Sequence, residues 1–362
     1  MRSRAIKDIS LRISTMVLLS LISYGCAGIG PRTIARDRFD YTTAISDSWK
    51  RQMLLNMVMM RYGDAPMFLD VASIINQYSV ETDASGSLFW AFPPAANSQA
   101  ISGHATYTDR PTITYNPLMG QKFAQNLMTP IPIGSILSLI NSGYPVDLVF
   151  RLCAHSINGI RNRYGGRART QFSDPEFYLL IEKLRRLQQS GTVGFRIQEE
   201  GAERTALLVL HKTLTPELED DKREVRRLLG LNPDIQAFRV VYGAIAKDDN
   251  EIAILSRSIL EILMDLASDI DVPEAHIAEK RANPTFSETT AAGTPIAPLM
   301  QIHSSREKPS DAFVSVPYRE YWFWVDDKDY PSKAIFSSLM LMFSLTETGT
   351  KEGAPIVTIP AG

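Results

Sequence analysis

Two short motifs of this sequence contain the residue types that acyl-transfer chemistry needs. Residues 305–308 (Ser-Arg-Glu-Lys) match the pattern S-x-x-K, and residues 156–158 (Ser-Ile-Asn) match S-x-N. Serine acyltransferases that act on peptidoglycan use both patterns, but in the opposite order and together with a K-T-G that is missing here. Ser305 also falls in a stretch that we expect to be irregular, where nothing would hold Ser305 and Lys308 at the roughly 3 Å that activation requires. We therefore expect neither motif to be catalytic.

The residue types that bind metals are scattered along the chain. The histidines stand at positions 104, 155, 211, 276 and 303, and no H-E-x-x-H or C-x-x-C spacing occurs. The acidic residues 326–329 lack the glycine and the distal glutamate of a calcium loop, and a helix cap before Pro331 explains Asp329. Neither G-x-S-x-G nor a phosphate-binding glycine loop is present. The sequence thus predicts no catalytic, cofactor or metal site.

The densest aromatic segment lies near the C-terminus, at residues 318–327. On a β-strand, Trp322 and Trp324 would share one face, and Tyr321 and Phe323 would share the other. If the tryptophan face is open, it is an aromatic patch suited to a protein partner or a sugar. If a helix covers it, the tryptophans belong to the core. The apolar helix expected just downstream favours core burial, which is our prediction.

The N-terminus has the layout of a signal peptide. Four basic residues among the first twelve precede an uncharged stretch at residues 13–25, which is typical of secreted proteins. A helix of this length is about 20 Å long, short of the roughly 30 Å that a membrane span needs. The stretch ends in Gly25-Cys26, which resembles the lipobox of bacterial lipoproteins, although Ser23 and Tyr24 depart from that pattern.

We therefore expect residues 1–25 to be removed and Cys26 to carry a lipid anchor. The alternatives are ordinary secretion, which leaves Cys26 as a plain thiol, and retention of the whole segment as an anchor. The residue after the cysteine is Ala27, not the aspartate that favours inner-membrane retention in enteric bacteria. The expected address is the outer membrane of the bacterial cell envelope.

The chain expected after cleavage is acidic. Residues 1–25 hold four of the 38 basic and one of the 40 acidic residues, so 34 and 39 remain, a formal charge of about −5. Without a basic block, the protein lacks the phosphate-neutralising surface that nucleic-acid binding requires, and we expect no such partner. Cys153 has no disulfide partner if Cys26 is lipidated. Its apolar neighbours predict a buried structural thiol rather than a nucleophile.

Local signals predict a series of helices and strands. A helix at 41–62 ends at Gly63 and, being apolar on nearly all sides, is expected to be buried. A hairpin is expected around residues 109–111, and His104 lies on its first strand. The expected elements are a helix at 41–62, extended structure at 67–80, a connection at 85–97, hairpin strands at 103–108 and 112–115, and three short helices within 117–163.

The second half of the chain continues in the same mixed manner. Proline and acidic residues begin helices at 175 and 216, and Ser258 with Glu261 fits a capping box. The charges of residues 219–227 are expected to form a solvated face with a Glu219–Arg223 pair. The other expected elements are hairpin strands at 193–198 and 205–210, strands at 235–246, 312–316, 321–325 and 356–359, a segment at 251–256 that fits strand or helix, and a helix at 332–345.

Mixed helices and antiparallel hairpins without regular alternation predict the α+β class. We expect a signal peptide at 1–25, a tether at 26–38, an N-terminal part at 39–165 with a helix, a hairpin and a helical layer, and a C-terminal α+β part at 166–362. The two parts could also form one domain. Residues 283–310, rich in Pro, Thr, Ala and Ser, are expected to be a mobile loop.

Several words of the sequence resemble a group of uncharacterised bacterial lipoproteins. They are Arg38-Phe39-Asp40-Tyr41, Ser48-Trp49-Lys50, Arg61-Tyr62-Gly63-Asp64-Ala65-Pro66, Asp109-Arg110-Pro111, Ser156-Ile157-Asn158-Gly159, Tyr321-Trp322-Phe323 and Thr358-Ile359-Pro360. The resemblance spans most of the mature chain. That group has no established activity, so the resemblance implies the envelope address and no site residue.

Two functions fit these observations. The first is a non-catalytic, membrane-tethered envelope protein that docks proteins or an envelope polymer. The second is an envelope hydrolase or transferase whose active residues meet only in three dimensions. A deep pocket that gathers His with Ser, Asp or Glu would favour the enzyme, and a flat exposed aromatic or apolar face would favour docking. We expect the docking protein.

Overall fold

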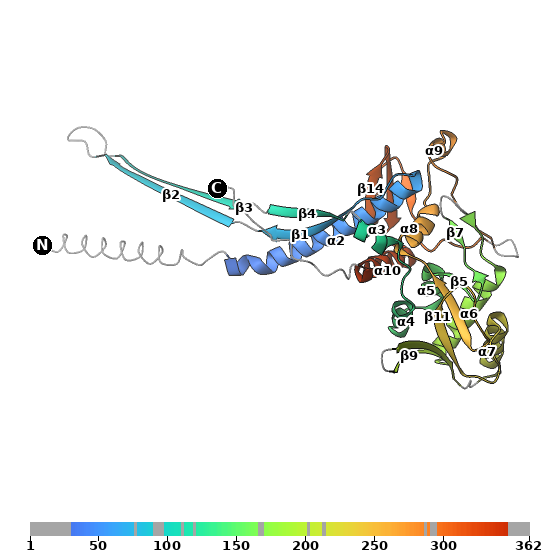
Figure 1. Ribbon diagram of the computed structural model, residues 1–362. Helices are drawn as coiled ribbons and strands as arrows, with labels where there is room; N and C mark the ends of the chain where they lie inside the picture. Colours follow the sequence, from blue (N-terminus) through green and yellow to red (C-terminus); the bar gives the residue numbers. More distant parts are fainter. Residues whose placement is uncertain are drawn as a thin grey trace. The chain divides into compact units, whose positions relative to one another are not determined.

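The structure is a computed structural model that describes most of the chain (Figure 1). The described residues are 30–75, 78–89, 98–109, 112–118, 121–165, 170–200, 203–211, 215–285, 288–289 and 295–346. The expected signal peptide, Cys26 and the strand expected at 356–359 lie outside them. The chain divides into two units, Met1–Trp49 with Leu69–Asn116 and Lys50–Phe68 with Pro117–Gly362. Helices combined with mixed and antiparallel sheets confirm the α+β class.

Helix α2 (Gly30–Tyr62) confirms the helix predicted at 41–62, although it begins earlier. It ends as expected, because Gly63 adopts a left-handed backbone conformation with φ 93°. Met53 and Met57 are at most 1% exposed, so these two methionines belong to the core. None of residues 41–52 is buried. The prediction of a wholly buried helix is wrong there because threonines and charged residues interrupt the apolar pattern.

The strands of the first unit pair in a way that local signals did not predict. Strand β2 (Tyr78–Phe89) pairs antiparallel with β3 (Ser98–Asp109) over its whole length, and β1 (Phe68–Ile75) pairs with β4 (Thr112–Leu118). The predicted pairing of 103–108 with 112–115 is therefore wrong, and so is a connection beginning at residue 85. A twelve-residue ladder satisfies more backbone groups than the short hairpin would.

A six-stranded mixed sheet lies at the centre of the second unit. Its strand order is β6-β5-β12-β11-β10-β9, and only β11 and β12 pair in parallel. The strands are β5 (Ala154–Ile157), β6 (Ile160–Arg161), β9 (Val193–Glu200), β10 (Glu203–Leu210), β11 (Ala237–Tyr242) and β12 (Glu251–Ser256). The ambiguous segment 251–256 is thus a strand, and its nearly continuous burial fits a central position.

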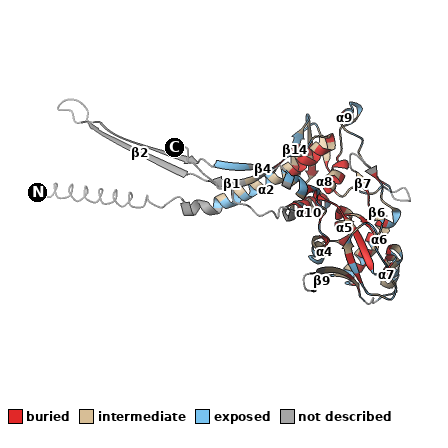
Figure 2. Ribbon diagram, viewed as in Figure 1, coloured by how far each residue is buried: buried red, intermediate tan, exposed pale blue. Residues whose placement is uncertain are grey.

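The helices of this unit contribute many of its buried side chains (Figure 2). They are α3 (Gln121–Met128), α4 (Ile133–Asn141), α5 (Val146–Cys153), α6 (Pro175–Gln189), α7 (Pro216–Leu229), α8 (Ile259–Ser268) and α9 (Glu274–Ala278). Helix α6 packs against α5 and α7, and α4 contacts β9, β10 and β11. No helix in the described ranges is sufficiently long and apolar for a membrane crossing.

The helix signals of the sequence hold in this unit. Helix α6 begins at Pro175 and buries the predicted apolar face. Ser258 and Glu261 form the predicted capping box. The charged stretch of α7 is only partly solvated, since Asp221 is 4% exposed and accepts hydrogen bonds from Lys183 and Arg186. Glu219 pairs with Lys222 rather than with Arg223, because residues three apart are also helix neighbours.

The end of the third short helix is set by a tight hairpin. Helix α5 stops at Cys153, and β5 and β6 follow, joined by Asn158-Gly159. Both turn residues have positive φ, 45° and 83°, which is the geometry that an Asn-Gly pair favours. The Asn158 side chain donates to the carbonyl of Leu229 at 2.8 Å and accepts from the amide of Ala253 at 2.6 Å. The word Ser156-Ile157-Asn158-Gly159 is therefore explained by the fold.

A second, three-stranded antiparallel sheet follows, and helix α10 (Tyr330–Thr346) comes after it. The strand order of this sheet is β13 (His303–Ser305), β15 (Tyr321–Asp326), β14 (Ala312–Tyr318). The strands and helix predicted here are confirmed. The Asp329 carboxylate accepts the amide of Ser332 at 3.1 Å, so it caps α10 as predicted.

The stretch 283–310, expected to be mobile, contains anchored residues. The Glu288 carboxylate is 2% exposed. It accepts hydrogen bonds from the Ser173 amide at 2.7 Å and from the Tyr178 hydroxyl at 3.0 Å. Met300 and Ile302 are fully buried, and β13 begins directly afterwards. The composition predicted little apolar burial here, which is wrong for these two side chains.

Candidate functional site

The three-stranded sheet has one buried and one open face. Cross-strand pairs place Trp324 between His303 and Ser315, and Trp322 between Ser305 and Pro317. Residues directly opposite each other on neighbouring strands share a face. We call these six residues the open face, because none of them is buried. The alternating residues of β14 and β15 are buried at 5% exposure or less: Val314, Val316, Phe323 and Val325.

The prediction that Trp322 and Trp324 belong to the core is wrong. Both are half-buried, whereas Phe323 and Val325 are fully buried. The buried face is covered by residues distant in sequence, including Tyr62 at the end of α2, whose ring lies 5.9 Å from that of Phe323. The strand alternation was predicted correctly, but it does not reveal which of its two faces is covered.

Trp324 is held by its neighbour on β13. The His303 ring stacks on the indole, with centroids 4.7 Å apart and an angle of 37° between the planes. His303 also lies 3.5 Å from Asp271, measured from Nδ1 to Oδ2. The Nε1 atom of Trp324 is buried and has no hydrogen-bond partner among the described residues. The accessible part of this indole is therefore ring carbon.

Trp322 lies beside residues 305–308, the segment that matches S-x-x-K. Ser305 is on strand β13, not in an irregular linker, and its hydroxyl donates to the carbonyl of Glu307 at 2.7 Å. The Lys308 ammonium lies 5.3 Å from the centre of the Trp322 ring. Ser305 is thus hydrogen-bonded to the backbone and Lys308 is held by a ring. This arrangement does not prepare Ser305 as a nucleophile.

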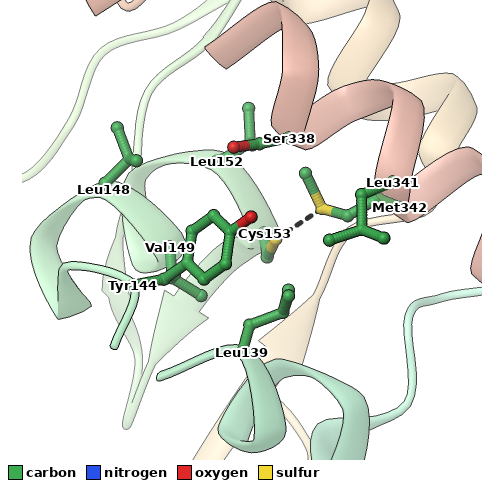
Figure 3. A pocket seen from close by; sticks show the side chains of 9 residues that line it. All are labelled: Leu139, Tyr144, Leu148, Val149, Leu152, Cys153, Ser338, Leu341 and Met342. Atoms are coloured by element: carbon green, nitrogen blue, oxygen red, sulfur yellow. Dashed lines mark hydrogen bonds between the residues drawn. The ribbon is translucent and has the colours of Figure 1, made fainter. Parts of the chain in front are cut away.

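Cys153 lines an apolar hollow between α4, α5 and α10 (Figure 3). The residues around this small hollow are Leu139, Tyr144, Leu148, Val149, Leu152, Cys153, Ser338, Leu341 and Met342. The Cys153 sulfur lies 3.6 Å from the sulfur of Met342, and burial raises the pKa of the thiol to about 12. A protonated, buried thiol is a poor nucleophile, which confirms the structural role predicted for Cys153.

The histidines differ in their surroundings. His104 is on β3 as predicted, His211 is exposed, and the ring of His155 lies 6.2 Å from that of Tyr164. His276 is buried, with Nδ1 2.6 Å from the hydroxyl of Tyr62. Across the described ranges, no three His, Cys, Asp or Glu side chains are grouped to hold a metal ion. Ser156, in the S-x-N motif, is 4% exposed within β5.

A buried ion cluster was missed by the sequence analysis. Arg257, fully buried, donates to Asp265 at 3.0 Å, and Arg163 donates to Asp269 at 2.7 Å. Burial, more than any other cause, raises the pKa of Asp269 to about 6. The four charges cancel, and the cluster joins residues 163–165 to α8. The spacing of two aspartates four apart on an apolar helix was the one available signal. We assign the cluster a structural role.

No family model, curated protein or solved structure matches this chain in the comparisons.

Proposed function

We propose that this protein is a non-catalytic component of the bacterial cell envelope, tethered by lipid on Cys26, that docks another envelope component through the open face. The observation that carries the proposal is the partly exposed pair Trp322 and Trp324 on one face of the sheet, since tryptophan is enriched among the residues that dominate binding energy. The signal-peptide layout and Gly25-Cys26 support the envelope address, and Ala27 supports the outer membrane.

The geometry gives less support to the alternative, an envelope hydrolase or transferase. Its strongest candidate is the pair His303 and Asp271, which lie 3.5 Å apart. A hydrolase built on such a pair needs a hydroxyl or thiol within hydrogen-bond reach of the imidazole. Within the described part of the chain, no Ser, Thr or Cys side chain is hydrogen-bonded to His303, and the hydroxyl of Ser305, on the same strand, donates to the carbonyl of Glu307.

Photo-cross-linking in living cells tests the docking proposal. A photoreactive phenylalanine analogue at Pro317, which is on the open face, should yield a cross-link to an envelope component. The same analogue at Tyr242, which is 57% exposed on β11, is the matched control and should yield none. Cross-linked protein is sought both as discrete adducts on denaturing gels and in the sacculus pellet after boiling in detergent. If Pro317 gives neither, the docking proposal fails.

The lipid tether is tested separately. The wild-type protein should incorporate labelled palmitate and sediment with membranes, and Cys26→Ser should do neither. A wild-type protein that takes up no label would show that the tether is wrong, and it would leave the cross-linking test of the open face unaffected.

A further inference from the structure

We infer that the open face binds a glycan chain of the cell wall, with sugar rings stacked on Trp322 and Trp324. This inference rests on the proposed docking function and names its partner. Two carbon-rich indole surfaces lie side by side on one strand, about 7 Å apart at the strand rise. Groups that can hydrogen-bond to sugar hydroxyls flank them on both neighbouring strands, namely His303 and Ser305 on one side and Ser315 on the other.

The size of the open face favours an oligosaccharide over a protein. Three strands about 4.8 Å apart, paired over three residues of about 3.3 Å, cover on the order of 150 Å². A stable protein interface buries about 800 Å² on each partner. The open face thus provides less than about a quarter of that area, which is enough for two or three sugar rings.

The sheet edges disfavour a peptide that binds by adding a strand. The outer strands are β13 and β14. β13 has three residues, and β14 carries Pro317, which has no backbone N–H to donate. Short edge strands and prolines are the devices that prevent strand addition. A partner must therefore bind through side chains on the face itself.

The chemistry of the rings and their surroundings matches a sugar. Indole faces carry partial negative charge and attract the polarised C–H groups of a pyranose ring. The N–H of Trp324 is turned inside, so this residue offers stacking and no hydrogen bond. Ser315 is partly exposed, and its hydroxyl makes no hydrogen bond to another described residue, so it can bond to a sugar hydroxyl. Lys308, beside Trp322, is placed to meet a carboxylate of the cell-wall polymer.

Two probes test the inference with full-length protein in detergent: purified peptidoglycan sacculi, and a soluble tetramer of N-acetylglucosamine. Wild-type protein should sediment with sacculi, and the tetramer should change its tryptophan fluorescence. Trp322→Ala with Trp324→Ala should weaken both interactions at least tenfold. Tyr242→Ala and Phe172→Ala remove exposed aromatics elsewhere and should change neither. Lys308→Ala should weaken retention on sacculi without weakening tetramer binding, because the tetramer has no carboxylate.

Trp322→Phe and Trp324→Phe guard against a folding artefact, since each keeps a stacking ring. They should retain more binding than the alanine variants at equal thermal stability. The inference is overturned if wild-type protein binds neither probe, or if the double alanine variant binds as wild type does. A discrete protein adduct from Pro317 without sacculus retention would overturn the glycan inference but keep the docking function. Absence of every cross-link would overturn both.

Discussion

The hydroxyl of Tyr62 and the Nδ1 atom of His276 lie 2.6 Å apart, which joins the end of α2 to α9 in the interior of the second unit. His276 is 5% exposed. The charged groups that influence it are Arg281, Arg319, Glu279 and Glu320, and burial is the main cause that lowers its pKa below 6.5. The folded protein therefore favours the neutral imidazole.

This pair predicts a loss of stability in mild acid. A histidine whose folded pKa is below its unfolded value stabilises the fold fully above about pH 6.5, and this contribution is lost as the pH falls through the folded pKa. The free energy of unfolding, measured by urea denaturation between about pH 7 and pH 5, should fall less steeply in His276→Gln than in wild type. If the unfolding free energies of the two proteins changed equally with pH, the lowered pKa of His276 would be contradicted.

The raised pKa of Asp269 predicts a change of stability with pH in the opposite direction, over a lower pH range. Its pKa is raised from 3.8 to about 6, so its contribution to stability is full below about pH 4 and is lost as the pH rises to 6. Two pKa units correspond to about 3 kcal/mol. Asp269→Asn, which cannot titrate, should lack this fall, and the stability advantage of wild type over the variant should shrink between pH 4 and 6. An advantage independent of pH would contradict the raised pKa.

Asn158 is predicted to matter for stability rather than for catalysis. Asn158→Ala removes the hydrogen bonds to Leu229 and Ala253. It also places alanine at φ 45°, a backbone conformation that asparagine tolerates better. Together these changes should cost about 3 kcal/mol of unfolding free energy. Asn158→Asp keeps the acceptor and the tolerance of this backbone conformation, so it should cost less. An alanine variant within about 1 kcal/mol of wild type would refute this role.

Neighbouring positions on β15 should respond very differently to truncation. Phe323→Ala opens a cavity in the core and should cost about 3 to 5 kcal/mol. Trp324→Ala removes a side chain that is only partly buried, together with its stacking contact with His303, so it should cost at least about 1 kcal/mol less than Phe323→Ala. Chemical denaturation of the two variants separates these values. A cost for Trp324→Ala equal to that for Phe323→Ala would mean that the tryptophan is core after all, and it would remove the basis of the proposed site.

Signals confined to a few residues predicted this structure well. Proline at Pro175, the cap at Ser258 and the glycine at Gly63 act on their own backbone, so each of these boundaries followed from local chemistry. Local chemistry did not predict which strands pair with each other. Strand β3 could pair with β2 or with β4, its neighbours along the chain. The longer ladder, with β2, forms because it satisfies more backbone groups than the shorter one.

The candidate site shows the same difference between features set by local sequence and features set by distant residues. Alternation on β15 correctly separated Trp322 and Trp324 from Phe323. Which face is buried depends on Tyr62, which lies far away in sequence and contacts Phe323 only in the fold. The ion pairs Arg257–Asp265 and Arg163–Asp269 likewise require the folded chain. Such contacts leave no periodic trace in a single sequence.

Two hairpins of this protein use the same turn geometry with very different residues. Asn158-Gly159 between β5 and β6, and Arg319-Glu320 between β14 and β15, have positive φ at both central positions. Arginine and glutamate are disfavoured in that conformation by about 1 to 2 kcal/mol each. The second turn is held by Asp64, which accepts hydrogen bonds from Tyr318 and Arg319.

The consequence is an order of folding events. The Asn-Gly turn can start its hairpin early from local preference alone. The Arg-Glu turn opposes its own hairpin until the chain after α2 brings Asp64 into place. We therefore expect the sheet that carries Trp322 and Trp324 to assemble late, after contacts between residues more than 250 positions apart have formed.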